Sequence, residues 1–194
     1  MARDRATDTA ALVAAAAEVF REKGYRNSTI DDIAEAAGIS RPTVYKYTKS
    51  KRWLLDRMVE TVTEDLGRRL RSVLSVDYDP ASTLERVIRT HVDAAAANRI
   101  FYAIVFSEET ELSEAGRERF RAWAHDVTTE FQTLLERCLE QAGRPESSTV
   151  DTWIAANLIL SMLTSLYRWY DPRGQTTPEE LSEQIKLVIG KTLF

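Results

Sequence analysis

The sequence has few residues that interrupt helices and only one cysteine. Seven glycines and five prolines occur among 194 residues, so most of the chain is free to be helical. The lone Cys138 excludes an intramolecular disulfide, which fits a reducing compartment. The longest unbroken apolar run, residues 100–106, is too short to span a bilayer, and the N-terminus lacks the apolar region of a signal peptide. We therefore expect a soluble cytoplasmic protein.

Groups that bind metals or carry out catalysis are also scarce. The two histidines, His91 and His125, have no second histidine or cysteine at metal-ligand spacing, so a structural or surface role is favoured for both. The sequence contains no glycine-rich phosphate loop and no nucleophile elbow. The carboxylates at 108–111 could in principle do acid–base chemistry, but a solvated helix end is the simpler interpretation. We expect no metal, no cofactor and no enzymatic activity.

Apolar residues make up 44% of the chain and recur at helical spacing along most of it. Residues 100–106 have the local propensity of a strand, but a buried helix is favoured because the chain offers no partner strand. The pattern predicts an all-α protein of about nine helices, with a three-helix head over residues 1–47 and a larger body over residues 48–194. The expected helical segments are 8–23, 29–47 (two short helices), 50 to about 74, 83–97, 99–111, 113–141, 149–170 and 178–194.

The most informative segment lies between residues 29 and 51. Thr29 and Asp32 stand at capping-box spacing, Gly38 can supply the positive φ that ends a helix, and Ser40 can cap the next helix. Pro42 falls in the first turn of that helix, where its missing N–H does no harm. Two short helices joined by a tight glycine turn form a helix-turn-helix unit.

Charge is distributed unevenly in a way that supports this interpretation. The whole chain has a formal charge of −4, yet residues 1–53 hold ten Lys/Arg and seven Asp/Glu. Five basic residues and no acidic ones occur between Ala36 and Leu55. A locally basic segment on an acidic protein indicates a polyanion site confined to one end.

A set of residues spread over positions 12–55 matches a known pattern: Leu12-Val13, Ala15-Ala16, Val19-Phe20, Lys23-Gly24-Tyr25, Ile33-Ala34, Ala37-Gly38-Ile39-Ser40, Tyr45, Lys51 and Leu54-Leu55. With these residues the segment resembles the DNA-binding domain of the TetR family of transcriptional regulators. The resemblance implies a homodimer whose last two helices form a four-helix interface, so a charge placed at Leu158 or Ile185 should yield monomers.

The second helix of the helix-turn-helix is rich in hydrogen-bond donors. We expect Arg41, Thr43 and Lys46 to contact base edges, and Pro42 to contact a thymine methyl group. The residues expected at phosphates are Thr29, Tyr45, Tyr47 and Lys51, the last two because of the resemblance. The partner would be a palindromic double-stranded DNA operator.

Aromatic and small polar residues in the body leave two interpretations open. They pack the core and a dimer interface, or they line a ligand pocket between helices. The segment 168–181 also resembles the end of TetR-family regulators of fatty-acid and sterol breakdown, several of which respond to acyl-CoA thioesters. The expected effector is a small, mainly apolar or aromatic molecule, an acyl-CoA among them. The candidate pocket residues are Phe101, Tyr102, Phe106, Trp123, Trp153, Asn157, Ser161 and Arg168.

These observations predict a ligand-responsive transcriptional repressor. The rival hypothesis is a helical ligand-binding or enzyme-like protein whose basic end only docks an acidic partner. Sequence-dependent retardation of a DNA duplex separates the two hypotheses.

Overall fold

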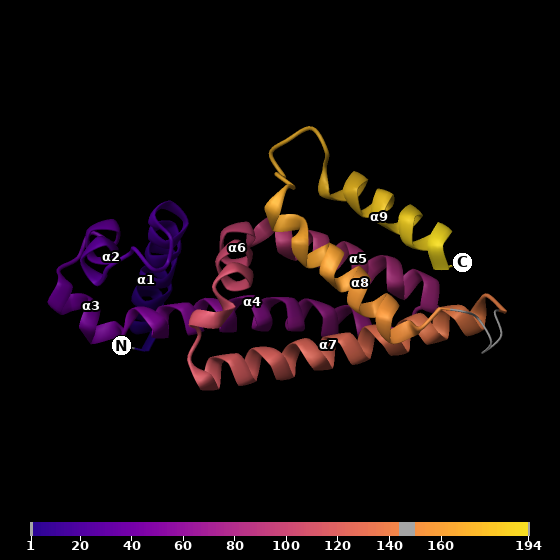
Figure 1. Ribbon diagram of the computed structural model, residues 1–194, viewed down its shortest axis with the longest axis horizontal. Helices are drawn as coiled ribbons and strands as arrows, with labels where there is room; N and C mark the ends of the chain where they lie inside the picture. The colour runs from indigo at the N-terminus through magenta and orange to yellow at the C-terminus, as the bar shows by residue number, and fades with distance from the viewer. Residues whose placement is uncertain (1, 144–149, 194) are drawn as a thin grey trace. The chain divides into compact units, whose positions relative to one another are not determined.

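The structure is a computed structural model that describes the backbone of residues 2–143 and 150–193, with side chains for residues 9–143 and 150–190. These residues form nine α-helices and two short 3₁₀ helices and contain no strand (Figure 1). The predicted all-α fold of about nine helices is confirmed. The elements are α1 (Ala2–Lys23), α2 (Ile30–Ala36), α3 (Arg41–Tyr47), α4 (Lys51–Leu74), α5 (Pro80–Ala97), α6 (Arg99–Ser107), η1 (Glu109–Glu111), α7 (Glu114–Gln141), α8 (Thr152–Thr164), η2 (Ser165–Arg168) and α9 (Pro178–Leu193).

The chain divides into two compact units whose limits differ from the predicted division at residue 47. The first unit holds residues 1–63 and 100–120, and the second holds residues 64–99 and 121–194. Residues 48–63 and 100–120 therefore group with the head, and residues just after α6 bond to residues near the start of α4 and before α2. Arg26 pairs with Glu111 at 2.9 Å, and the Ser113 N–H donates to Asp56 at 3.1 Å.

Helix boundaries in the head follow the local signals. Helix α2 starts after Thr29 and α3 starts after Ser40, as the capping pattern predicts. Helix α1 begins at Ala2, earlier than the predicted residue 8. The core of the first unit includes Leu12, Phe20, Ile33 and Val44, all buried.

Several boundaries in the body differ from the prediction. The helices predicted over 99–111 and 149–170 end at Ser107 and Thr164, and each is followed by a short 3₁₀ helix. Helix α5 begins at Pro80 instead of residue 83, because the Asp79 carboxylate accepts the Ser82 N–H at 3.1 Å and so caps the helix. Asp151 caps α8 in the same way. Residue 149, where the predicted helix begins, lies outside the described residues. The apolar segment 100–106 is helical, as expected, and lies within α6.

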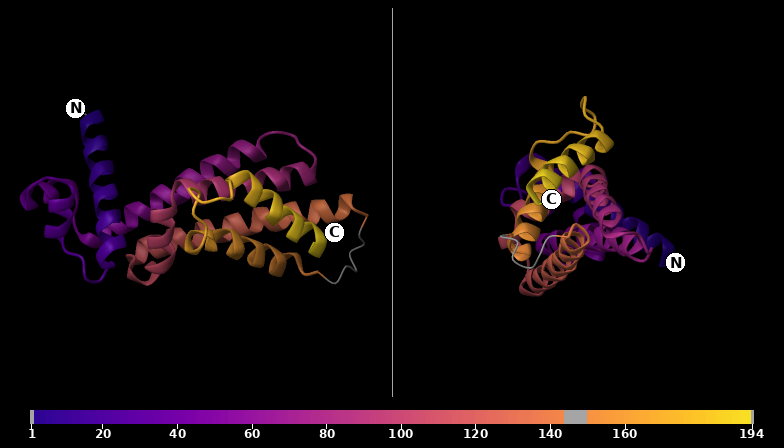
Figure 2. Two further views of the ribbon diagram at one scale, coloured as in Figure 1. Left: turned by 90° about the horizontal axis from the view of Figure 1, so that it is seen from above. Right: turned by 90° about the vertical axis from the view of Figure 1, so that its right-hand side faces the viewer.

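The second unit is organised around α5. This helix packs against both α8 and α9 (Figure 2). Its buried face includes Leu84, Val87, Ile88 and His91. Helix α9 starts with a capping box in which Thr177 and Glu180 each accept the other's backbone N–H. Among the described residues, no helix is both long and apolar enough to cross a membrane.

Candidate nucleic-acid interface

The turn between α2 and α3 has the geometry that its residues predict. Gly38 has φ +66°, a conformation that L side chains rarely adopt. Ser40 then accepts the Thr43 N–H at 3.4 Å, and its hydroxyl lies 2.8 Å from the Thr43 hydroxyl. Val44 is fully buried and attaches α3 to the core of the first unit. Helix α3 is therefore held by one inward residue, while most of its other side chains face solvent.

The start of α2 is fixed by a small charged network. Asp32 accepts hydrogen bonds from the Thr29 N–H at 2.8 Å and the Thr29 hydroxyl at 2.7 Å. The Lys23 ammonium lies 2.5 Å from the other oxygen of Asp32. The hydrogen bonds from Lys23 and then from Thr29 lower the pKa of Asp32 to about 2. Asp32 therefore stays ionised at neutral pH and holds α1 to α2.

The exposed face of α3 carries the predicted base-contacting groups. Arg41, Pro42, Tyr45 and Lys46 are exposed, and Thr43 is half-buried. The Arg41 guanidinium lies 2.8 Å from Asp31 and 5.9 Å from the centre of the Tyr45 ring. Lys46 forms no ion pair within the described residues. This face offers a guanidinium, an ammonium and hydroxyls, the donors that suit guanine edges and phosphate oxygens.

Lys51 has a different environment from the other predicted phosphate ligands. Its ammonium donates to three backbone carbonyls, those of Tyr25 at 2.5 Å, Ser28 at 2.8 Å and Arg26 at 3.3 Å. It also lies 4.4 Å from the centre of the Tyr25 ring. Burial lowers the pKa of this ammonium. Since all three N–H bonds of an ammonium have acceptors here, Lys51 ties the loop before α2 to the start of α4.

The eight predicted pocket residues are divided between the two units. Phe101, Tyr102 and Phe106 belong to the first unit, where the Tyr102 and Phe106 rings lie 5.7 Å apart. The other five belong to the second unit. Trp153, Asn157, Ser161 and Arg168 are exposed, and Trp123 is half-buried.

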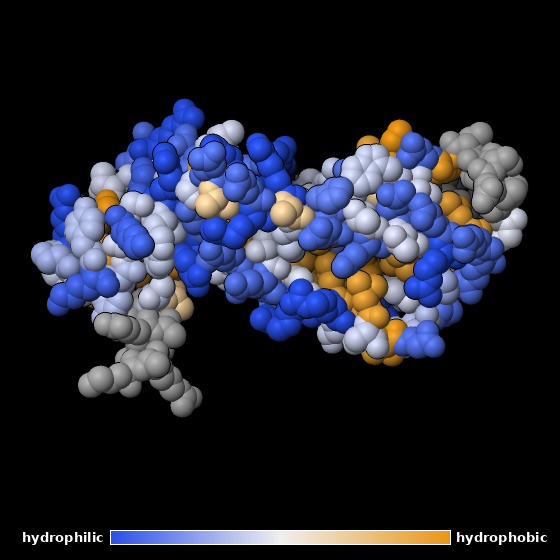
Figure 3. All heavy atoms as spheres, turned by 90° about the horizontal axis from the view of Figure 1, so that it is seen from below, coloured by the Kyte–Doolittle hydropathy of each residue, from blue (hydrophilic) through white to orange (hydrophobic). Residues whose placement is uncertain are grey.

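Helix α8 instead presents an apolar face to solvent. Ile154 and Leu158 on α8 and Leu187 and Val188 on α9 are exposed; Leu158 is 66% exposed. On the face drawn in Figure 3, hydrophobic residues gather on the second unit, whereas the first unit is mostly hydrophilic. Ile185 is only 6% exposed, so it packs in the core of the monomer and does not share this face. The expectation that a charge at Ile185 separates a dimer is therefore withdrawn, because it would disrupt the monomer itself.

Comparison with known proteins gives two matches to family models that together span most of the chain. Residues 12–58 match the model described as bacterial regulatory proteins, tetR family. Residues 77–192 match the tetracyclin repressor-like C-terminal domain. The chain belongs to the TetR family. It is a ligand-responsive, DNA-binding transcriptional regulator of the repressor type.

Individual relatives agree with this assignment. The transcriptional repressor KstR2 of Rhodococcus jostii is 29% identical over 92% of this chain and 87% of its own. The crystal structure of the TetR-family regulator PfmR from Thermus thermophilus aligns with TM-score 0.82 and 28% identity, covering 92% of this chain and 96% of that one. AibR, solved in complex with isovaleryl coenzyme A and operator DNA, aligns with TM-score 0.80 and 19% identity over 93% of this chain and 97% of its own. The last similarity shows the shared fold alone.

Proposed function

We propose that this TetR-family protein represses transcription as a two-fold dimer that places α3 of each protomer in the major groove of a palindromic operator. The observation that carries this proposal is the exposed face of α3, with its donor groups held out by a single buried residue, Val44. A two-fold protein reads two inverted half-sites, one under each recognition helix.

The residues proposed to contact DNA fall into two groups, those at base edges and those at phosphates. Arg41 and Lys46 would donate to guanine edges, Thr43 to a neighbouring base, and Pro42 would contact a thymine methyl group. Arg41 must first exchange its Asp31 partner for DNA, which favours guanine because guanine offers two acceptors to a guanidinium. Thr29, Tyr45 and Tyr47 would contact phosphates. We now assign Lys51 to supporting the helix-turn-helix, since its ammonium already bonds to three carbonyls.

The dimer would form through α8 and α9. Ile154 and Leu158 of α8 and Leu187 of α9 are exposed apolar residues. Exposed apolar side chains on two neighbouring elements mark a protein–protein contact, and a two-fold axis lets one patch meet its own copy.

The effector would be a small, mainly apolar or aromatic molecule that releases the operator. The resemblance of residues 168–181 to regulators of fatty-acid and sterol breakdown makes an acyl-CoA one candidate. A ligand releases DNA only by binding the DNA-free geometry more tightly than the DNA-bound geometry. We also propose that the protein acts in the cytoplasm and has no enzymatic activity. The rival hypothesis of an acidic protein partner is not favoured by the family assignment.

Duplex retardation by the purified protein tests the proposal. DNA flanking its own gene is compared with a shuffled sequence of equal length and composition. The proposal predicts a salt-sensitive complex with the native duplex that survives excess shuffled competitor. Equal retardation of both duplexes would contradict sequence-specific repression.

A further inference from the structure

Arg41 and Asp31 bring opposite charges together on the exposed side of the helix-turn-helix. Arg41 is the first residue of α3, and Asp31 lies in the first turn of α2. The guanidinium Nη1 of Arg41 donates to the carboxylate Oδ2 of Asp31 at 2.8 Å, although the two residues are ten positions apart in the sequence. The first turn of α2 therefore places an acceptor directly beside a donor group at the start of the recognition helix.

The pair has little to do with the stability of the fold. The side chain of Arg41 is 56% exposed and that of Asp31 is 62% exposed, and a surface ion pair of this kind adds little to stability. The neighbouring Asp32 already makes the structural contacts of this turn, with Thr29 and Lys23. Within the part of the chain that the structure describes, the Asp31 carboxylate bonds to no other side chain. Asp31 is therefore available for a function at the DNA surface.

A G·C base pair presents the complementary pattern in the major groove. Guanine offers two neighbouring acceptors, N7 and O6, and cytosine offers the N4 amino donor beside them. A guanidinium suits the two acceptors, and a carboxylate accepts from the amino group. An A·T pair has its donor between two acceptors, so it does not give a guanidinium two adjacent acceptors. The donors of Arg41 and the acceptor of Asp31 thus match a G·C pair in order as well as in kind.

We propose that Asp31 is a specificity-determining residue that accepts the N4 amino group of the cytosine paired with the guanine that Arg41 contacts. The two side chains are partners in the free protein and separate on the operator, where each finds a new partner on the same base pair. The inference rests on the proposed function and adds a base contact from α2 to those assigned to α3. At any other base pair the separated Asp31 carboxylate loses a partner and gains none, which disfavours that sequence.

Two base analogues test this on the operator that the full-length protein selects from random duplexes. 7-Deazaguanine lacks the N7 acceptor. N4-methylcytosine still pairs with guanine, but its methyl group projects into the major groove in place of the exposed amino hydrogen. Each analogue is placed at the base pair whose preference Arg41→Ala relaxes. Both should weaken binding of the wild-type protein, by about threefold to tenfold each.

Two variants on α2 separate a base contact from a general effect of charge. Asp31→Ala should lose its sensitivity to N4-methylcytosine and keep its sensitivity to 7-deazaguanine. Glu35→Ala, which changes an exposed glutamate on the same helix, is the matched control and should stay sensitive to both analogues. Each variant removes one negative charge, so both should bind all duplexes somewhat more tightly than the wild type. Because both residues are exposed, neither substitution should prevent folding, and urea unfolding checks this.

Four results would overturn the inference. They are a relaxed position in Arg41→Ala that is not a G·C pair, wild-type binding that N4-methylcytosine does not change, loss of sensitivity to both analogues in Asp31→Ala, and the same response to the analogues in Asp31→Ala and Glu35→Ala. The third result would make Asp31 a support for Arg41, and the fourth would leave only an effect of charge.

The same measurements separate the failure of this inference from the failure of the proposed function. If any of the four results is found while Arg41→Ala relaxes one position in each half-site, the recognition-helix assignment stands and only the inference falls. If the full-length protein selects no operator, the proposed function itself fails and the inference falls with it.

Discussion

The helix-turn-helix and the body of this protein are specified in different ways. In the α2–α3 segment every boundary is set by residues within a few positions of it: Thr29 with Asp32, then Gly38, then Ser40. In the body, α8 is apolar around most of its circumference, so only packing against α5 decides which side faces inward. Local chemistry therefore predicts the head closely, while the body depends on tertiary contacts that a single sequence does not display.

The largest expected effect comes from comparing a charge placed on the surface of the body with a charge placed in its core. Leu158→Glu places a charge on the exposed face of α8, so the monomer should stay folded while the dimer dissociates. Loss of the second half-site contact should weaken operator binding about a hundredfold or more. Sedimentation and duplex binding measure both effects.

Ile185→Glu is the matched control in α9. It introduces a charge at a buried position, so it should destabilise the monomer itself, by about 3–5 kcal/mol. If Leu158→Glu stays dimeric, or if Ile185→Glu yields a well-folded monomer, the assignment of inner and outer faces is wrong.

The next largest effect concerns the exposed face of α3. Lys46→Ala and Arg41→Ala should each weaken operator binding by about 1–3 kcal/mol and relax base preference at one position in each half-site. Lys49→Ala, which changes an exposed lysine just beyond α3, is the control and should act equally on all duplexes. Binding to a set of single-base operator variants tests this. Uniform losses for all three variants would remove the recognition-helix assignment.

A variant of Lys51 tests whether this residue stabilises the head or contacts DNA. Lys51→Ala removes an ammonium that bonds to three carbonyls, so it should lower the free energy of unfolding by about 1.5–3 kcal/mol. Urea unfolding measures this, with Lys49→Ala again as the control. Unchanged stability combined with a salt slope lower by about one unit per site would restore Lys51 as a phosphate ligand.

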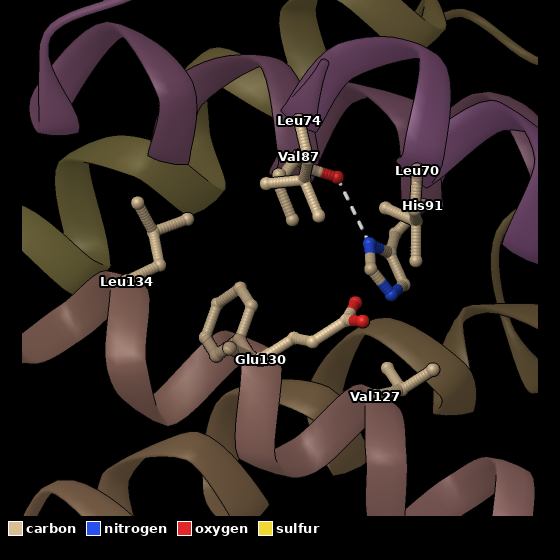
Figure 4. Close-up of a pocket in the computed structure, with 8 residues that line it drawn as sticks. Leu70, Leu74, Val87, His91, Val127, Glu130 and Leu134 are labelled. Atoms are coloured by element: carbon tan, nitrogen blue, oxygen red, sulfur yellow. Dashed lines mark hydrogen bonds between the residues drawn. The ribbon is translucent and has the colours of Figure 1, made fainter.

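The smallest effect tests the neutral, buried His91 of the body. Its pKa is lowered in the folded protein, so as pH falls below about 6.5 the unfolded chain binds a proton that the folded protein does not. The free energy of unfolding should therefore fall by about 1 kcal/mol more between pH 7 and pH 5.5 in the wild type than in His91→Phe. Glu130 of α7 faces the ring across a small cavity (Figure 4), so Glu130→Gln is measured in parallel. Identical pH dependence in the wild type and His91→Phe would show that His91 is not held neutral.

The same contrast explains what the sequence could predict. The fold class, the helix-turn-helix and the outward position of Arg41 and Lys46 follow from capping residues, a glycine turn and helical spacing. Lys51 looked like a free basic residue because its three carbonyl partners lie 23 to 26 positions earlier in the chain. Asn157 and Ser161 were equally suited to a pocket or an interface, because periodicity does not say which apolar face is covered.

The environment of His91 could be predicted from the sequence only in part. It follows Leu84, Val87 and Ile88 at helical spacing, which places it on the buried face of α5. Its spacing predicts burial, but not the neighbour across the cavity. Glu130 comes from α7, 39 positions later, and only the folded structure brings the two side chains to one space.

Selection of duplexes from a random DNA pool by the full-length protein, followed by sequencing, tests whether the protein reads a two-fold operator through α3. We predict enrichment of an inverted repeat whose half-sites are separated by about one helical turn, 10 base pairs, or a multiple of it. We also predict that Lys46→Ala selects a repeat with one base position relaxed in each half. A pool that shows no enrichment, or that enriches a single unpaired site with the same sequence for wild type and Lys46→Ala, would contradict recognition of a two-fold operator by α3.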